Sequence, residues 1–213
     1  MTRSFTAPLQ AGLPEAELLA RLAPFGGERD PLALAKTLVV RLAREQLRAA
    51  LLALRDGADT RCDQLLDVVG IDYLSYPEWR GPRFAVVYPL KSTVFRHRLA
   101  LKVLVEEDDA VVPSVHDLYR SANWAEREVW DQFGIVFQGH PNLKRLLNHH
   151  EFVGHPLRKD YPCQKRQKLS LNDPMHDELI AKLESLGWQV LERPEPSPGI
   201  PLGPMAASAG GQR

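Results

Sequence analysis

The sequence predicts an α+β domain, in which a mixed or antiparallel sheet of about four to five strands packs on helices, followed by a long extended C-terminal arm. Two observations support this fold class. Side chains over residues 95–105 alternate between apolar and polar, as in a strand with one covered face. Residues 140–168 are interrupted by prolines and glycines and lack sustained periodicity, which indicates an extended connection rather than regular structure.

The first elements are expected to be a helix, a strand and a second helix. Residues 13–23 form a short amphipathic pattern that ends at a Pro-Phe-Gly-Gly turn. Residues 37–42 contain two adjacent valines and favour a strand, although one continuous helix over 32–54 is the alternative. Residues 44–55 are rich in Leu, Ala, Arg and Glu and favour a helix that the following Asp-Gly pair ends.

Three further strands are predicted in the middle of the chain. Residues 65–74 are apolar with an interior glycine, and residues 83–90 and 95–105 are expected to pair as antiparallel strands. Helical segments are predicted at 114–119 and 123–133.

The predicted elements divide the chain into four parts. Residues 1–36 are an N-terminal extension with the short helix, and residues 37–137 are the α+β core domain. Residues 138–170 form an extended basic arm that is expected to bind a partner. Residues 171–213 contain a candidate helix over 173–186, and the rest of this tail is rich in Pro, Gly, Ser and Ala. Such a composition is typical of a segment that is disordered alone or extended along a partner.

Composition excludes several classes of function. The chain carries 27 lysines and arginines and 27 aspartates and glutamates, a formal net charge of zero, which argues against a dedicated nucleic-acid binder. Cys62 and Cys163 form no C-x-x-C pair, whereas clusters and structural zinc sites usually need about four soft ligands. No cofactor is therefore expected in this chain. No signal peptide is expected, and no apolar run reaches about 18 residues, so membrane contact is expected only through partners.

The segment 123–133 has two contrasting faces when it is placed on a helix. One face is apolar, and the opposite face carries Arg127, Glu128, Asp131 and Gln132. Arg127 and Asp131 are four residues apart and are expected to pair. Trp124 lies on the polar face, where an interface anchor and a local core residue are equally good interpretations.

Glu126 falls in the middle of the apolar face, where a carboxylate must be neutral, paired or hydrogen-bonded. The simpler interpretation is a capping box, with Asn123 as the N-cap and Glu126 bonding back to its backbone N–H. The alternative is a buried ion pair with an arginine of the arm or of a partner.

Gly-His-Pro occurs twice, and four of the seven histidines gather in this region: His140, His149, His150 and His155. A metal-dependent hydrolase is therefore an alternative function. The spacings, however, match no helix-borne pair of metal ligands, and histidines bonded to the backbone in two turns explain the pattern equally well. A purified chain that carries stoichiometric metal would decide the question.

The arm is basic: Lys144, Arg145, Arg158, Lys159, Lys165, Arg166 and Lys168 are opposed only by Glu151 and Asp160 between residues 140 and 168. A solvated loop is one explanation, and an acidic groove on a partner protein is the functional one. Nucleic acid is a weaker third interpretation, because few aromatic residues lie between the basic ones.

Two long motifs connect the helix to the arm. The first comprises Glu126, Arg127, Glu128, Asp131, His140, Lys144, Leu146 and Leu147. The second is G-H-P-[LF]-R-K-D-[YF]-P, which Gly154–Pro162 matches in full. Together they resemble the C subunit of NADH:quinone oxidoreductase, which is the 30 kDa subunit of respiratory complex I. The resemblance covers about residues 37–162, and its one departure within the motifs is Gln132, where an apolar residue is usual.

The resemblance implies a structural subunit without catalytic residues or cofactors of its own. The FMN and iron–sulfur clusters would lie in other subunits, and the chain would brace the D and B subunits of the hydrophilic arm at the cytoplasmic face of the inner membrane. The expected partner contacts are Trp124, Arg127, His140, Arg145, His155, Arg158 and Lys159. The residues expected to order the helix and receive the arm are Asn123, Glu126, Glu128 and Asp131.

Two points stay open within this resemblance. A homologous subunit of a membrane-bound hydrogenase or related dehydrogenase would have the same scaffold role with different redox partners. Downstream of residue 162 the chain departs from the family's acidic run, so a different partner or an accessory subunit is the alternative for the tail. Reversing the charges of Arg158 and Lys159 is expected to lower assembly without altering the isolated domain.

Overall fold

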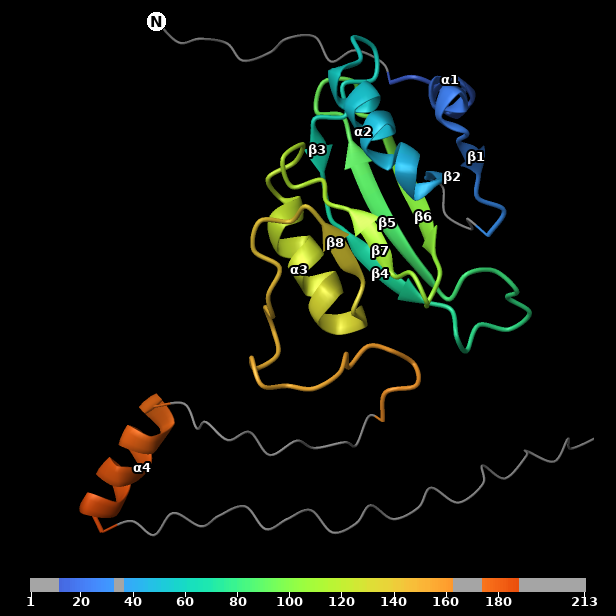
Figure 1. Ribbon diagram of the computed structural model, residues 1–213. Helices are drawn as coiled ribbons and strands as arrows, with labels where there is room; N and C mark the ends of the chain where they lie inside the picture. Colours follow the sequence, from blue (N-terminus) through green and yellow to red (C-terminus); the bar gives the residue numbers. More distant parts are fainter. Residues whose placement is uncertain (1–11, 33–36, 163–173, 188–213) are drawn as a thin grey trace, which may run out of the picture. The chain divides into compact units, whose positions relative to one another are not determined.

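The computed structural model describes residues 12–32, 37–162 and 174–187. The chain forms two units, residues 1–168 and 169–213. The first unit contains a mixed sheet and three α-helices (Figure 1). The predicted α+β class and mixed sheet are therefore confirmed, but the main sheet has six strands instead of about four to five.

The main sheet has six strands in the order β1-β2-β6-β5-β3, and β4 also pairs with β5. Its strands are β1 (Glu28–Arg29), β2 (Leu38–Leu42), β3 (Gln64–Leu65), β4 (Val69–Asp72), β5 (Phe84–Lys91) and β6 (Arg98–Val105). β2 and β6 are parallel, whereas the remaining pairs are antiparallel. A second, two-stranded parallel sheet joins β7 (Val111–Pro113) to β8 (Val136–Gln138).

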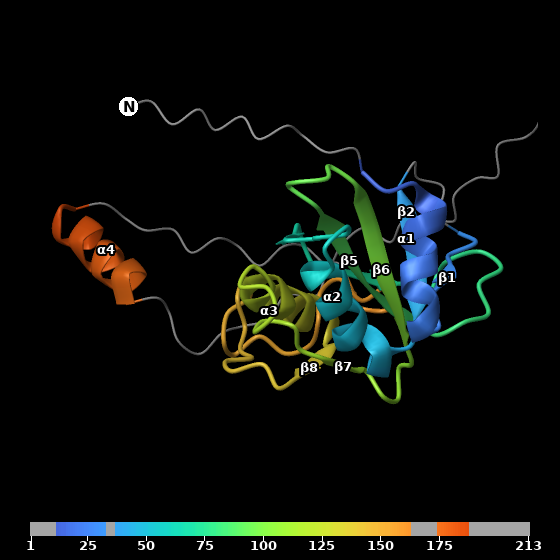
Figure 2. The same ribbon diagram turned by 90° about the horizontal axis from the view of Figure 1, so that it is seen from above.

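One face of the main sheet is covered by α1 (Glu15–Leu22), α2 (Leu47–Asp56) and α3 (Ala122–Phe133) (Figures 1 and 2). Short 3₁₀ turns at Ala23–Phe25 and Arg44–Gln46 follow α1 and precede α2. The helix-covered face collects the alternate residues Leu38, Val40 and Leu42 of β2, Phe84, Val86, Tyr88 and Leu90 of β5, and Leu99, Leu101, Val103 and Val105 of β6. This period of two is the pattern from which the strand over 95–105 was predicted.

The helix α3 approaches the sheet closely at Gly70. A Cβ on this residue would lie 2.6 Å from the Phe133 ring. Glycine at the centre of β4 therefore allows the helix to pack directly on the backbone. The strand predicted over 65–74 is interrupted at residues 66–68 and forms β3 and β4, which both pair with β5.

Two predicted elements are shorter or different in the structure. The strand predicted from residue 95 begins at Arg98, because Arg96 has a left-handed φ of 62° and forms a turn with Ser92. The helix predicted over 114–119 is a turn, in which the N–H groups of Leu118 and Tyr119 both bond to the Val115 carbonyl. The alternative of one helix over 32–54 is wrong, since β2 lies within it.

The core begins earlier in the chain than the predicted boundary at residue 37. Leu18 and Leu22 of α1 are buried with the core of the sheet, and β1 extends the sheet beyond β2. The amphipathic pattern of α1 was recognised, but its partner surface is formed by strands far along the sequence.

In the second unit, α4 (Pro174–Ser185) occurs where the candidate helix was predicted. The last part of the arm and the Pro/Gly-rich tail lie outside the described residues. No helix in the ranges that the structure describes is long and apolar enough to cross a bilayer.

Candidate interaction site: helix α3 and the arm

The N-terminus of α3 differs from the predicted capping box. The helix begins at Ala122, with Ser121 at the N-cap position and no side-chain capping bond. Asn123 is already inside the helix, so its side chain cannot serve as the N-cap. The Asn123 carbonyl instead accepts a hydrogen bond from His140 Nε2 at 3.0 Å, because His140 Nδ1 accepts the Asn142 N–H.

Glu126 is fully buried and is bound by the segment that precedes α3. Its carboxyl group accepts the Ser114 hydroxyl and, at 2.7 Å, the Val115 N–H. Arg48 of α2 donates to the Ser114 carbonyl and pairs with Asp117, not with Glu126. Burial raises the pKa of Glu126 to about 7, although both hydrogen bonds oppose this shift. The predicted capping box is therefore absent, and no arginine of the described part of the arm pairs with Glu126.

Asp131 is the anchor of the arm. Its carboxylate accepts N–H groups from three consecutive arm residues, Leu146, Leu147 and Asn148, at 2.9–3.0 Å. The guanidinium of Arg145 adds an ion pair at 2.6 Å. Burial alone would raise the pKa of Asp131, but these donors lower it to about 2. Asp131 therefore binds the arm, and the predicted pair with Arg127 is not formed.

The two arginines Arg127 and Arg145 fasten the same stretch of arm. Arg127 donates to the carbonyls of Lys144 and Arg145 at 3.1 and 3.0 Å. Besides its bond to Asp131, Arg145 donates to the Gly154 carbonyl and lies over the Trp130 ring. The arm thus covers part of the polar face of α3, and Arg127, Asp131 and Gln132 are buried.

The second motif caps the C-terminus of α3, where helix carbonyls lack partners within the helix. His155 Nδ1 donates to the Asp131 carbonyl, the Leu157 N–H to Gln132, and Arg158 Nε to Phe133 at 2.6 Å. The helix ends at Gly134, whose φ of 77° is left-handed and whose Cβ would lie 2.6 Å from the His155 ring. Burial lowers the pKa of His155, which favours its neutral form.

A cluster around Arg83 fixes the far end of the arm to the sheet. Arg83 makes two hydrogen bonds to Asp72 of β4 and ion pairs with Asp160 of the arm and Glu107. The Lys159 backbone N–H also donates to Asp72, at 2.9 Å. The Asp72 and Arg83 side chains are 0% and 8% exposed, so this end of the arm is held by buried charges.

The predicted partner contacts divide into two groups. Five of them use their hydrogen-bonding groups within the chain: Arg127, His140, Arg145, His155 and Arg158. Trp124, 63% exposed with Arg127 over its ring, and the side chain of Lys159 face outward. The exposed Glu128 side chain does not receive the arm. Reversal at Arg158 is therefore expected to affect the isolated domain as well, because Arg158 Nε caps the end of α3.

The arm exposes large apolar side chains that are not among the predicted partner contacts. Leu147, Val153 and Leu157 are 64%, 68% and 52% exposed. Single exposed apolar residues are ordinary, but three on one short irregular segment are typical of a surface that binds a partner. Ser114, Asp72 and Arg83 were also missed, because each contacts α3 or the arm from a distant part of the sequence.

The four histidines considered for a metal site do not converge. His140 and His155 bond to helix carbonyls, and His149 Nδ1 accepts the Glu151 N–H. Within residues 12–32, 37–162 and 174–187, no three His, Cys, Asp or Glu side chains are placed to hold a metal ion.

Comparison with known proteins decides the family. A model of the 30 kDa subunit of respiratory-chain NADH dehydrogenase matches residues 40–167, more than half of the chain. The chain belongs to this family. The matched range contains the strands β3 to β8, helix α3 and the described part of the arm, which ends at residue 162. These are the parts that form the site described above.

Curated relatives of the 30 kDa family agree with this assignment. The C subunit of NADH-quinone oxidoreductase from Acidithiobacillus ferrooxidans is 50% identical over 127 residues, which cover 59% of this chain and 63% of that protein. Its counterpart from Legionella pneumophila strain Corby is 44% identical over 166 residues, covering 66% of this chain and 73% of that protein. The matched region thus spans less than two thirds of the Acidithiobacillus relative.

Two solved structures share the fold. A trypsin-resistant fragment of Nqo5, residues 1–134, is 39% identical with a TM-score of 0.54, and the match covers 61% of this chain and all of the fragment. A chain of the archaeal membrane-bound sulfane sulfur reductase, a respiratory membrane complex, has a TM-score of 0.55 at 22% identity, covering 86% of this chain and 94% of that chain. The second likeness concerns the fold alone.

Proposed function

We propose that this 30 kDa family member is a structural subunit of the peripheral arm of a proton-translocating NADH:quinone oxidoreductase, without catalytic residues of its own. In this role FMN and the iron–sulfur centres lie in other subunits. The chain contacts the D and B subunits and reaches the cytoplasmic face of the inner membrane only through the complex.

The observation that carries this proposal is the anchoring of the arm to its own domain. Asp131 and Arg83 bind the arm at two places, and the donors of His155, Leu157 and Arg158 are used by the end of α3. A loop fixed in this way loses little further conformational entropy on binding. It presents Trp124, Leu147, Val153 and Leu157 in a preformed arrangement.

Such rigidity suits a scaffold of an electron-transfer complex. Electron tunnelling falls steeply with distance, so neighbouring redox centres need constant spacing. A protein that braces its neighbours through a preorganised surface would contribute that spacing without chemistry of its own.

A related respiratory complex with another electron donor is the second candidate. The sulfane sulfur reductase likeness supports it at the level of fold, whereas the 44–50% identities to relatives from NADH-quinone oxidoreductases favour NADH. The two candidates are distinguished by expressing this chain in a bacterial host that lacks its own copy of the 30 kDa protein and measuring the electron-transfer activity of its membranes. Restoration of NADH:quinone activity by this chain supports the first candidate, and restoration of another donor's activity alone supports the second.

The surface is tested by replacing Leu147 and Val153 together with serine. We expect the isolated variant to melt within a few degrees of the parent chain, because both side chains are exposed, and its recovery in the assembled complex to fall. Leu52→Ser on α2, which is 43% exposed, is the matched control for removing an exposed apolar side chain. Recovery of the double variant equal to that of the control would remove the arm from the proposal.

A further inference from the structure

The face of the main sheet opposite the helices is apolar as well. The helices α1, α2 and α3 pack on the face formed by Val40, Val86 and Leu101 and their neighbours. The alternate residues of the same strands point to the other side, and six of them are aliphatic or proline and at least partly exposed: Val39, Val69, Ile71, Val87, Pro89 and Leu104. A sheet whose second face meets water normally carries polar residues there.

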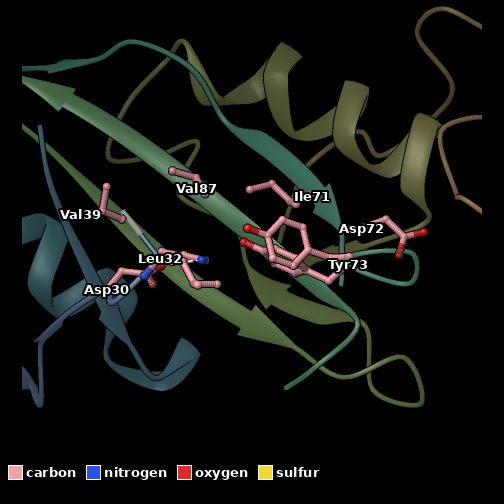
Figure 3. A pocket seen from close by; sticks show the side chains of 9 residues that line it. Asp30, Leu32, Val39, Ile71, Asp72, Tyr73 and Val87 are labelled. Carbon is pink, nitrogen blue, oxygen red and sulfur yellow. Dashed lines mark hydrogen bonds and ion pairs between the residues drawn. The ribbon is translucent and has the colours of Figure 1, made fainter. Parts of the chain in front are cut away.

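The charged groups near the middle of this face neutralise one another. Lys102 and Asp30 form a buried ion pair at 2.5 Å, and Lys102 also lies over the rings of Tyr73 and Trp79. The side chains of Lys102 and Asp30 are 6% and 4% exposed. Around this pair a pocket lies over the face formed by β2, β6, β5 and β4, and Val39, Val87 and Ile71 line it (Figure 3). Its rim includes Leu32 and Tyr76, which are 38% and 50% exposed.

One end of the face is basic. Lys91 of β5 lies directly opposite Arg98 of β6, and both point to the side of Val87. Like charges in this position destabilise a sheet. Neither side chain forms an ion pair within the described part of the chain, so their repulsion is not offset internally.

From these observations we infer that the open sheet face docks an amphipathic helix of a neighbouring subunit, with its apolar stripe on Val39, Val87 and Ile71 and acidic residues against Lys91 and Arg98. A helix is the element that covers a sheet face, and here it would complete a three-layer packing. Opposite charge at one end would set the direction in which it lies. This inference rests on the proposed role as a member of a multi-subunit complex.

The occupant is identified by a photo-crosslinking residue at position 87 in the full chain, assembled in a host that lacks its own copy. A control crosslinker is placed at Leu52, on the helix-covered side. We expect position 87 to capture a helical peptide of another subunit that contains acidic residues and is not captured from position 52. Capture of this chain's residues 163–213, of a second copy, of nothing, or of the same peptide from both positions would overturn the inference.

The variant Lys91→Glu separates docking from folding. It places a carboxylate opposite Arg98, so the isolated chain is expected to melt at the same or a higher temperature. Recovery in the complex should nevertheless fall by about tenfold or more, because the new charge opposes the acidic partner. Unchanged recovery would overturn the inference. If the parent chain does not enter a NADH:quinone oxidoreductase, the proposed function is wrong and the inference is wrong with it. If the parent chain and the Lys91→Glu variant both enter normally, only the docking face is refuted.

Discussion

Helix α3 carries two fully buried carboxyl groups, Glu126 and Asp131, whose surroundings differ in a way that explains how the site is held together. Glu126 receives one N–H and one hydroxyl from the segment before the helix, and its pKa rises to about 7. Asp131 receives three backbone N–H groups and a guanidinium from the arm, and its pKa falls to about 2. Burial raises the pKa of both groups, and Glu126 lies deeper in the protein; at Asp131 the larger number of donors outweighs burial.

The largest expected effect follows from Asp131→Asn. The change leaves Arg145 without its counter-charge and turns a strong acceptor into a weak one, so the free energy of unfolding should fall by about 3–5 kcal/mol. Chemical denaturation of the isolated chain measures this loss. Glu128→Gln, an exposed change on the same helix, should stay within about 0.5 kcal/mol. Equal stability of the two variants would show that Asp131 does not anchor the arm.

A smaller effect, of opposite sign, is expected for Glu126→Gln. The folded-state pKa of Glu126 is raised, so its stabilising effect is complete below the unfolded-state value of 4.5 and is lost as pH rises through about 7. Between pH 5 and pH 8 the parent chain should lose about 2–3 kcal/mol from this group. The glutamine variant should lack this loss and be the more stable protein at pH 8. An equal dependence of the unfolding free energy on pH in the parent chain and the glutamine variant would contradict the raised pKa of Glu126.

Asp131 should titrate in a separate window. Its folded-state pKa is lowered, so its stabilising effect is present above the unfolded-state value of 3.8 and is lost as pH falls through about 2. The loss is about 2 kcal/mol and should be absent from Asp131→Asn. Melting temperatures between pH 2 and pH 4 compare the two chains, and an identical acid dependence would refute the link between the arm and this carboxylate.

The smallest effect on the isolated chain is expected for Trp124→Ala. The indole is 63% exposed and contacts the Arg127 guanidinium, an exposed cation–π contact that contributes about 0.5–1 kcal/mol. Thermal melting should therefore change little, while recovery of the variant in the complex should fall. A large loss of stability without any loss of assembly would place Trp124 in the fold rather than at an interface.

The sequence predicted what depends on local periodicity. The two faces of α3, the antiparallel pair β5–β6 and the position of α4 follow from alternation and helical spacing. The partners of Asp131 could not be predicted. The spacing of side chains on a helix predicts a pair with Arg127, four residues away, but it says nothing of Arg145, which follows the helix in the arm. Glu126 was assigned to a capping box for the same reason, since Ser114 lies outside the helix. The motifs marked the right residues, but sequence alone could not show that they bind one another.

The parallel pairing of β2 with β6 also affects how the chain is made. β2 ends at Leu42, and the strand that closes its second edge begins only at Arg98. At synthesis rates of about 5–20 residues per second, the edge stays unpaired for several seconds after β2 leaves the ribosome. Chaperone demand during translation is therefore concentrated on the first half of the polypeptide, and truncation before Val105 should yield aggregates rather than a smaller domain.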